Sequence, residues 1–264
     1  MILARYLRDE QFENISINSN LLTQLDVSLR RLILSTPEYN HVEAPQNSKV
    51  LIIYTIRFDG KGYRVFTIEE LLEYFNQAQE VERIALQIET EGSLGSNRAI
   101  GSYFDLKFDN KQSSFLTVSS DNEAWMNDSF TSTKEIIQKY RNKHGYVRNA
   151  WVGLLIQLFG VLIGFILSLW VAKKISPSLN IENSFLISFL LILLIFSNLW
   201  TQIGSRLSAI LNFTFPAIRF KREEKDQLHW IYQALVGGIV VALTLYLLDK
   251  AFSYMGTTLG AFIN

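Results

Sequence analysis

The chain has 264 residues, of which 25 are basic and 25 acidic, so it carries no formal net charge. This balance gives no global field that would favour an acidic partner, and no nucleic-acid partner is expected. The absence of cysteine excludes disulfide bonds, thiolate metal sites and cysteine nucleophiles. Charged residues are spread through the first half, whereas after Trp151 they form short clusters between long apolar runs.

The first predicted elements are a helix and a β-hairpin. Leucines recur at spacings of three and four over residues 19–34, which predicts a helix. Residues 37–46 contain two prolines and indicate a loop. Residues 49–66 are rich in β-branched and aromatic side chains and are interrupted by Asp59 and Gly60, the two-residue signal of a hairpin turn.

Two further helices and three strands complete the first half. A capping box at residues 67–70 predicts a helix that ends near Gln77, and a second box at residues 120–123 begins the last helix of this half. Period-two alternation predicts strands at residues 84–88, 103–108 and 115–119. The order of these elements predicts an α+β cytosolic domain over residues 1–145, with a mainly antiparallel sheet and flanking helices.

The last helix of the domain bears on how the two halves are joined. Its apolar residues follow a heptad-like spacing: Met126, Phe130, Thr133, Ile137 and Tyr140. This spacing continues past His144 into the first apolar run, so one continuous helix would couple the domain to the membrane. The favoured alternative is an amphipathic helix packed on its own sheet with a joint at Gly145, because glycine costs about 1 kcal/mol in a helix interior.

Three apolar segments predict an all-α membrane domain over residues 146–264, since each span needs about 20 mostly apolar residues. The three transmembrane helices are expected at residues 151–171, 185–204 and 230–248. Tryptophans near their ends are the expected interfacial anchors: Trp151, Trp170, Trp200 and Trp230. The stretch 205–220 is expected to extend the second span into the cytosol and to end near Pro216.

The distribution of Lys and Arg predicts the orientation. Four basic residues precede the first span and five lie between the second and third, whereas two follow the first span and one follows the third. We therefore expect a plasma (inner) membrane protein with a cytosolic amino terminus and a carboxyl terminus on the far side.

Small and polar side chains form one face on each of the first two spans. The face of the first span predicts close helix packing and contact between subunits of a homo-oligomer, and it consists of Gly153, Gln157, Gly160, Gly164 and Ser168. The face of the second span consists of Asn198, Thr201, Gln202, Ser205 and Asn212. Unpartnered amides are costly in hydrocarbon, so this second face is expected either to bond other helices or to line a polar path through an oligomer.

No arrangement of side chains in the sequence predicts an enzyme, a cofactor or a metal site, and the three histidines are far apart. The leading hypothesis is a multi-pass membrane sensor or effector, whose cytosolic domain binds a protein or a small molecule and controls an oligomeric transmembrane region. A channel or pore that permeabilises the bilayer, as in bacterial antiviral defence, is one outcome of such control. The alternative is a non-conducting scaffold that recruits a cytosolic partner to the membrane.

Overall fold

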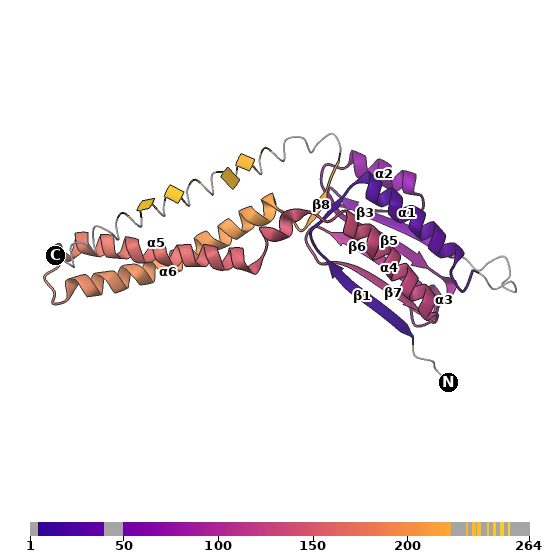
Figure 1. Cartoon of the computed structure of the whole chain (residues 1–264), viewed down its shortest axis with the longest axis horizontal. Coiled ribbons are helices and arrows are strands. Elements are labelled where there is room, and N and C mark those ends of the chain that lie inside the picture. The colour runs from indigo at the N-terminus through magenta and orange to yellow at the C-terminus, as the bar shows by residue number, and fades with distance from the viewer. Residues whose placement is uncertain are drawn as a thin grey trace. The chain divides into compact units, whose positions relative to one another are not determined.

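The computed structural model describes residues 5–39, residues 50–222 and individual positions between 231 and 253. The chain forms two compact units, and most of their elements are labelled in Figure 1. The first unit comprises Met1–Gly145 and Pro216–Asp226, and the second comprises Tyr146–Phe215 and Gln227–Asn264.

The first unit is an α+β domain built on a six-stranded sheet of order β1-β7-β6-β5-β3-β4, in which every neighbouring pair is antiparallel. The strands are β1 (Tyr6–Phe12), β3 (Leu51–Phe58), β4 (Lys61–Val65), β5 (Val81–Glu89), β6 (Tyr103–Asp109) and β7 (Ser114–Ser120). The helices α1 (Ser19–Leu34), α2 (Ile68–Gln77) and α4 (Glu123–Lys139) pack on one face of the sheet (Figure 1). The predicted antiparallel α+β domain with flanking helices is therefore confirmed.

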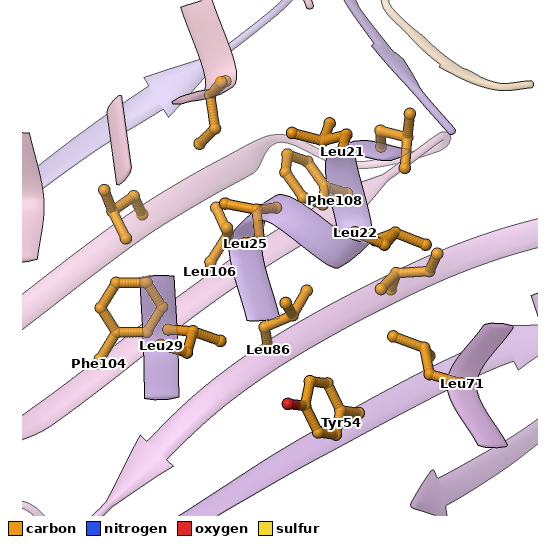
Figure 2. Packing of buried hydrophobic residues seen from close by; sticks show 14 of the residues in the cluster. Leu21, Leu22, Leu25, Leu29, Tyr54, Leu71, Leu86, Phe104, Leu106 and Phe108 are labelled. Carbon is orange, nitrogen blue, oxygen red and sulfur yellow. The ribbon is translucent and has the colours of Figure 1, made fainter. Parts of the chain in front are cut away.

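The core lies between this helix layer and the sheet. Figure 2 shows leucines of α1, among them Leu25 and Leu29, over the side chains of Leu86, Phe104 and Leu106 from the sheet. All five of these side chains are buried. The leucines that recur at the helical period of α1 and the alternating apolar residues of β5 and β6 thus form the two sides of one apolar interface.

Side-chain caps define where the helices begin. The Asn18 side chain accepts a hydrogen bond from the Leu21 N–H at 2.9 Å, which begins α1. The Asn122 side chain accepts from the Trp125 N–H at 3.0 Å and begins α4. The predicted box at residues 120–123 therefore lies two residues too early, because Ser120 is still part of β7. Such caps satisfy N–H groups that have no partner inside the helix.

The predicted hairpin turn is confirmed. Asp59 and Gly60 both have positive φ, at 50° and 75°, as a two-residue turn between twisted antiparallel strands requires. The turn joins β3 to β4 with Phe58 opposite Lys61.

The prediction of one continuous helix between the two halves is wrong, and the packing of an amphipathic helix on its own sheet is confirmed. α4 ends at Lys139, a short 3₁₀ turn follows at Lys143–Tyr146, and the next helix begins only at Ala150. Met126 and Ile137 of the heptad-like seam are buried in the core of the domain. Burial of these side chains against the sheet therefore accounts for the heptad-like spacing along α4.

Several elements were not predicted from the sequence. They are β1, β2 (Ile15–Ile17), the short helix α3 (Glu91–Gly95) and β8 (Ile218–Phe220). β1 lies at an edge of the sheet; most of its residues are exposed, and three of its seven residues are charged. Charged side chains on an edge strand protect it from pairing with other chains, but they also remove the apolar alternation that would reveal it.

β8 follows the second apolar helix in the chain, yet it belongs to the domain. It pairs in parallel with β2, so that Ile15 lies opposite Ile218 and Ile17 opposite Phe220. Backbone hydrogen bonds run from the Ile15 N–H to the Ala217 oxygen at 3.0 Å and from the Lys221 N–H to the Ile17 oxygen at 2.6 Å. From the sequence, this segment is expected in the membrane domain over residues 146–264.

The side chains of β8 complete the core. Ile218 is only 3% exposed, and the Phe220 ring meets Phe75 edge-on with centroids 6.4 Å apart. Beyond the strand, Arg222 Nη2 donates to the Gln79 oxygen at 2.6 Å. The domain is therefore completed only after the chain has passed through its two apolar helices.

Among the described residues, two helices are long and apolar enough to cross a membrane, rather than the three predicted. They are α5 (Ala150–Ile175) and α6 (Ser184–Thr214), joined through a 3₁₀ turn at Ser176–Ser178. Their length and composition support membrane association. The predicted span at residues 230–248 falls largely outside the described residues. α6 ends at Thr214, so the predicted extension of the second span to near Pro216 is present as helix.

Replacing Ile218 by Ala tests whether β8 is part of the folded domain. Truncating a buried aliphatic side chain typically costs about 2–5 kcal/mol, so we expect a clearly lower thermal unfolding midpoint for the full chain in mild detergent. Ile100→Ala is the matched control, because Ile100 is 58% exposed and the same atoms are removed. Equal midpoints for the two variants would contradict the placement of β8 in the core.

Candidate functional site

The hairpin of α5 and α6 packs closely because α5 has glycine at two contact positions. A Cβ atom added at Gly160 would lie 1.8 Å from Cε2 of Trp200, and one added at Gly164 would lie 2.3 Å from Cδ1 of Phe196. Both glycines are buried. In lipid, where helices have no hydrophobic reason to associate, close packing of this kind is the interaction that would hold such a pair together.

The same contacts define how the two helices are aligned. Gly164 lies one turn after Gly160, whereas Phe196 lies one turn before Trp200. The helices are therefore antiparallel, and in this register Trp151 lies level with about Ala209. Consequently the polar residues of α6 lie beside the first half of α5.

The predicted small-residue face of α5 is divided between contact and exposure. Gly160, Gly164 and Ser168 are buried, and the Ser168 hydroxyl donates to the Gly164 oxygen at 2.7 Å. Gly153 and Gln157 are exposed. The contact between subunits that the sequence predicted for this face is occupied, at Gly160 and Gly164, by α6 of the same chain.

A groove of about 640 Å³ runs between α5 and α6 and brings together residues of both predicted faces. Its lining from α5 includes Gly153, Gln157, Gly160 and Gly164, and its lining from α6 includes Thr201, Ser205 and Ser208. Most of the surface is apolar, with a few polar groups near one end, as in many sites for small molecules or lipid chains. Asn198, Gln202 and Asn212 do not line the groove and are exposed.

Three polar side chains of α6 each donate one hydrogen bond to a carbonyl oxygen of the same helix. Asn198 Nδ2 donates to the Leu194 oxygen at 3.3 Å, and the Thr201 hydroxyl donates to the Ser197 oxygen at 3.1 Å. The Ser205 hydroxyl donates to the Gln202 oxygen at 2.8 Å. These bonds lower the cost of placing the groups in hydrocarbon. Bonding to another helix and a polar path both stay predictions.

The tryptophans predicted as interfacial anchors have different environments. Trp151 and Trp170 are 70% and 51% exposed near the two ends of α5, and the Lys174 ammonium lies 5.3 Å from the centre of the Trp170 ring. Trp200 instead packs on Gly160 near the middle of α5, so its side chain serves the packing of the hairpin. Trp230 lies outside the described residues.

The sheet of the domain carries a cluster of paired charges around Tyr103. Arg98 forms an ion pair with the buried Glu89 at 2.7 Å, and its guanidinium lies 4.0 Å from the centre of the Tyr103 ring. The Tyr103 hydroxyl donates to Asp105 at 2.8 Å. Burial, and after it the charge of Asp105, raises the pKa of Tyr103 well above its ordinary value.

A second buried tyrosine lies under α1. The Tyr54 hydroxyl donates to the Asp26 carboxylate, which also pairs with Arg30 at 2.9 Å. Burial, and then this hydrogen bond, raises the pKa of Tyr54 above its ordinary value. A phenol with a raised pKa remains a protonated donor at neutral pH, so both tyrosines are suited to holding the domain together rather than to general-base chemistry.

Within the part of the chain that the structure describes, no group of three or more His, Cys, Asp or Glu side chains is arranged to hold a metal ion. No protein-family model, curated protein or solved structure matches the chain. The residues that carry a functional conclusion are therefore those of the hairpin groove and of the strand pair β2–β8.

Replacing Gly160 by Ala tests the packing of the hairpin. The added methyl group must displace Trp200, and overpacking of this kind typically costs about 1–3 kcal/mol. Gly153→Ala is the matched control, because a Cβ there meets nothing within 4 Å and Ala favours a helix by about 1 kcal/mol over Gly.

Thermal loss of helical circular dichroism in detergent measures both variants. We expect a lower midpoint for Gly160→Ala, an unchanged or higher one for Gly153→Ala, and partial recovery when Gly160→Ala is combined with Trp200→Leu. A Gly160→Ala protein as stable as the Gly153→Ala protein would show that the helices do not meet there.

Proposed function

We propose that the chain is a multi-pass membrane sensor or effector. Its α+β domain lies in the cytosol, binds a protein or a small molecule, and transmits the resulting change to the transmembrane helices. The observation that supports this best is the pairing of β2 with β8, because it attaches the domain to the hairpin at both ends of the hairpin.

Both attachments are short. Three residues, 147–149, separate the 3₁₀ turn of the domain from α5, and three residues, 215–217, separate α6 from β8. Three residues span at most about 11 Å when fully extended. A displacement of β2, β8 or the end of α4 is therefore transmitted to a helix end rather than absorbed by a long linker.

The proposed orientation follows from the same connections. A hairpin that leaves a domain and returns to it has both ends on one side of the bilayer. The two connecting segments, residues 139–149 and 215–222, contain seven Lys or Arg and no Asp or Glu, whereas the turn between α5 and α6 is preceded by only Lys173 and Lys174. The excess of basic residues favours a protein of the plasma (inner) membrane whose domain lies in the cytosol.

The proposal includes the third span at residues 230–248 and a carboxyl terminus on the far side.

In this proposal the chain forms a homo-oligomer. Asn198 and Gln202, which are exposed on α6, contact other subunits, and the groove between α5 and α6 lies beside them. The output is a change in membrane permeability, of the kind used by effectors of bacterial antiviral defence. No catalytic activity is proposed.

The second candidate is a non-conducting scaffold that recruits a cytosolic partner to the membrane. The internal hydrogen bonds of Asn198, Thr201 and Ser205 favour it, because each gives a donor of these side chains a partner within its own helix, without water or another subunit.

Inserting a flexible ten-residue Gly/Ser linker between Phe215 and Pro216 distinguishes the two candidates. β8 still pairs with β2, but the connection to α6 no longer transmits force. The readouts are dye release from proteoliposomes and the maleimide labelling rate of a Ser205→Cys variant, which has no background because the chain has no other cysteine.

For a sensor or effector, the insertion is expected to change the labelling rate severalfold and to alter dye release. The same linker inserted between Asp59 and Gly60, in an exposed turn of the domain, is the control and is expected to change neither. Identical labelling and release for the parent and both insertions would favour the scaffold.

Labelling of single cysteines tests the topology. In cells, a membrane-impermeant maleimide is expected to label Ser178→Cys, in the turn between α5 and α6, and Asn264→Cys. It is expected to label Lys61→Cys, in the domain, only after the membrane is opened. Protection of Asn264→Cys would remove the third span from the proposal, and labelling of Lys61→Cys in intact cells would invert the orientation.

A further inference from the structure

We propose that one end of the domain is a binding surface for the anionic headgroups of phospholipids. At this end the chain leaves the domain for the hairpin and returns from it. We call it the exit surface, and it consists of Lys139, Arg141, Lys143, Arg219, Lys221 and Arg222. The inference rests on the proposed membrane location of α5 and α6.

The fold brings the two halves of the exit surface together through β2. The Ser16 N–H donates to the Tyr140 oxygen at 2.9 Å, and the Asn142 N–H donates to the Asn14 oxygen at 2.7 Å. On the other side of β2, the Lys221 N–H donates to the Ile17 oxygen. Segments about 80 residues apart in sequence are thus held against one three-residue strand.

This strand lies at one defined end of the sheet. β2 follows β1 directly, and the last residue of β1, Phe12, pairs with the first residue of β7, Ser114. The same end holds the β3–β4 turn and the segment before β5, where Arg222 donates to the Gln79 oxygen. The two exits of the chain are therefore at one end of the domain, together with the basic residues that flank them.

The charge of this end is concentrated and outward. Lys139, Arg141, Lys143 and Lys221 are exposed, and none of them forms an ion pair with another described residue. Exposed carboxylates of the described part also lie at or near this end: Glu13, Asp59, Glu80 and Glu135, the last of them one helical turn before Lys139. Glu223 and Glu224 follow in the sequence. Among the described residues, the six basic side chains of the exit surface outnumber these four carboxylates, although the chain as a whole is neutral.

The exits of the chain lie next to the proposed membrane helices, and for this reason we expect the bound anion to be a lipid headgroup. Only three residues separate β8 from α6, and the headgroup layer on each side of a bilayer is roughly 5–7 Å thick. The first connection also continues into Tyr146 and Trp151, which are 79% and 70% exposed and are of the type that favours the headgroup level. Guanidinium and ammonium groups held at this level pair with lipid phosphates.

The test uses the full chain in mild detergent, titrated with phosphatidylglycerol or phosphatidylcholine, with bound lipid counted by native mass spectrometry. The test variant is Arg141→Gln/Lys143→Gln. The charge-matched control is Arg31→Gln/Arg64→Gln, which removes two exposed basic residues from α1 and β4.

We expect phosphatidylglycerol to bind in preference to phosphatidylcholine, and the test variant to weaken that binding on the order of tenfold while the control changes it less than about twofold. Equal binding of the two lipids, or equal loss in the two variants, would overturn the inference. So would tighter binding of a single-stranded oligonucleotide at the same salt concentration, since it would assign the exit surface to nucleic acid.

This experiment is independent of the one for the proposed function. Loss of lipid selectivity with a normal response to the linker between Phe215 and Pro216 would overturn the exit surface alone. Selective binding of phosphatidylglycerol in a protein that does not respond to that linker would support the exit surface and count against the sensor or effector.

Discussion

The parallel pairing of β8 with β2 is the interaction on which the arrangement of the whole chain depends. It involves only three residues on each strand, but it places Ile218 in the core of the domain and Phe220 against Phe75. Because β8 comes after α6, the apolar hairpin is an insertion within the domain rather than a tail attached to it. Both ends of the hairpin are thereby tied to one folded body, and the proposals for orientation, coupling and lipid contact all follow from this constraint.

The hairpin depends on a different physical effect, the close approach of two helices. Gly160 and Gly164 leave space that the large rings of Trp200 and Phe196 fill, so small residues on one helix are matched by aromatic residues on the other. The polar residues of α6 are tolerated because several of them bond to their own backbone. What remains accessible is a groove with a few polar groups near one end, which a lipid chain, another helix or a ligand could enter.

The sequence was sufficient to predict a helix or strand wherever one face of that element is buried. α1, α2, the β3–β4 hairpin and strands β5, β6 and β7 were all predicted, because burial against a single apolar layer imposes a period on the chain. β1 was not predicted, because an edge strand with Arg8, Asp9 and Glu10 shows no such period. β2 and β8 were not predicted, because a pair of three-residue strands, separated by about 200 residues, has no local sequence signature. For the candidate site, the stripe of glycines on α5 indicated close packing. Its partners on α6, Phe196 and Trp200, could not be predicted, because bulky residues that face another helix show the same sequence pattern as bulky residues that face lipid.

Hydrogen exchange of the backbone amides of residues 218–222, measured on the full chain in detergent, tests the central claim most directly. The account predicts that the Lys221 N–H, which donates to the Ile17 oxygen, exchanges as slowly as the Ser16 N–H on the neighbouring strand. Exchange of Lys221 at the rate of an unstructured peptide, while Ser16 and the strands of the sheet stay protected, would show that β8 is not part of the domain and would contradict the account.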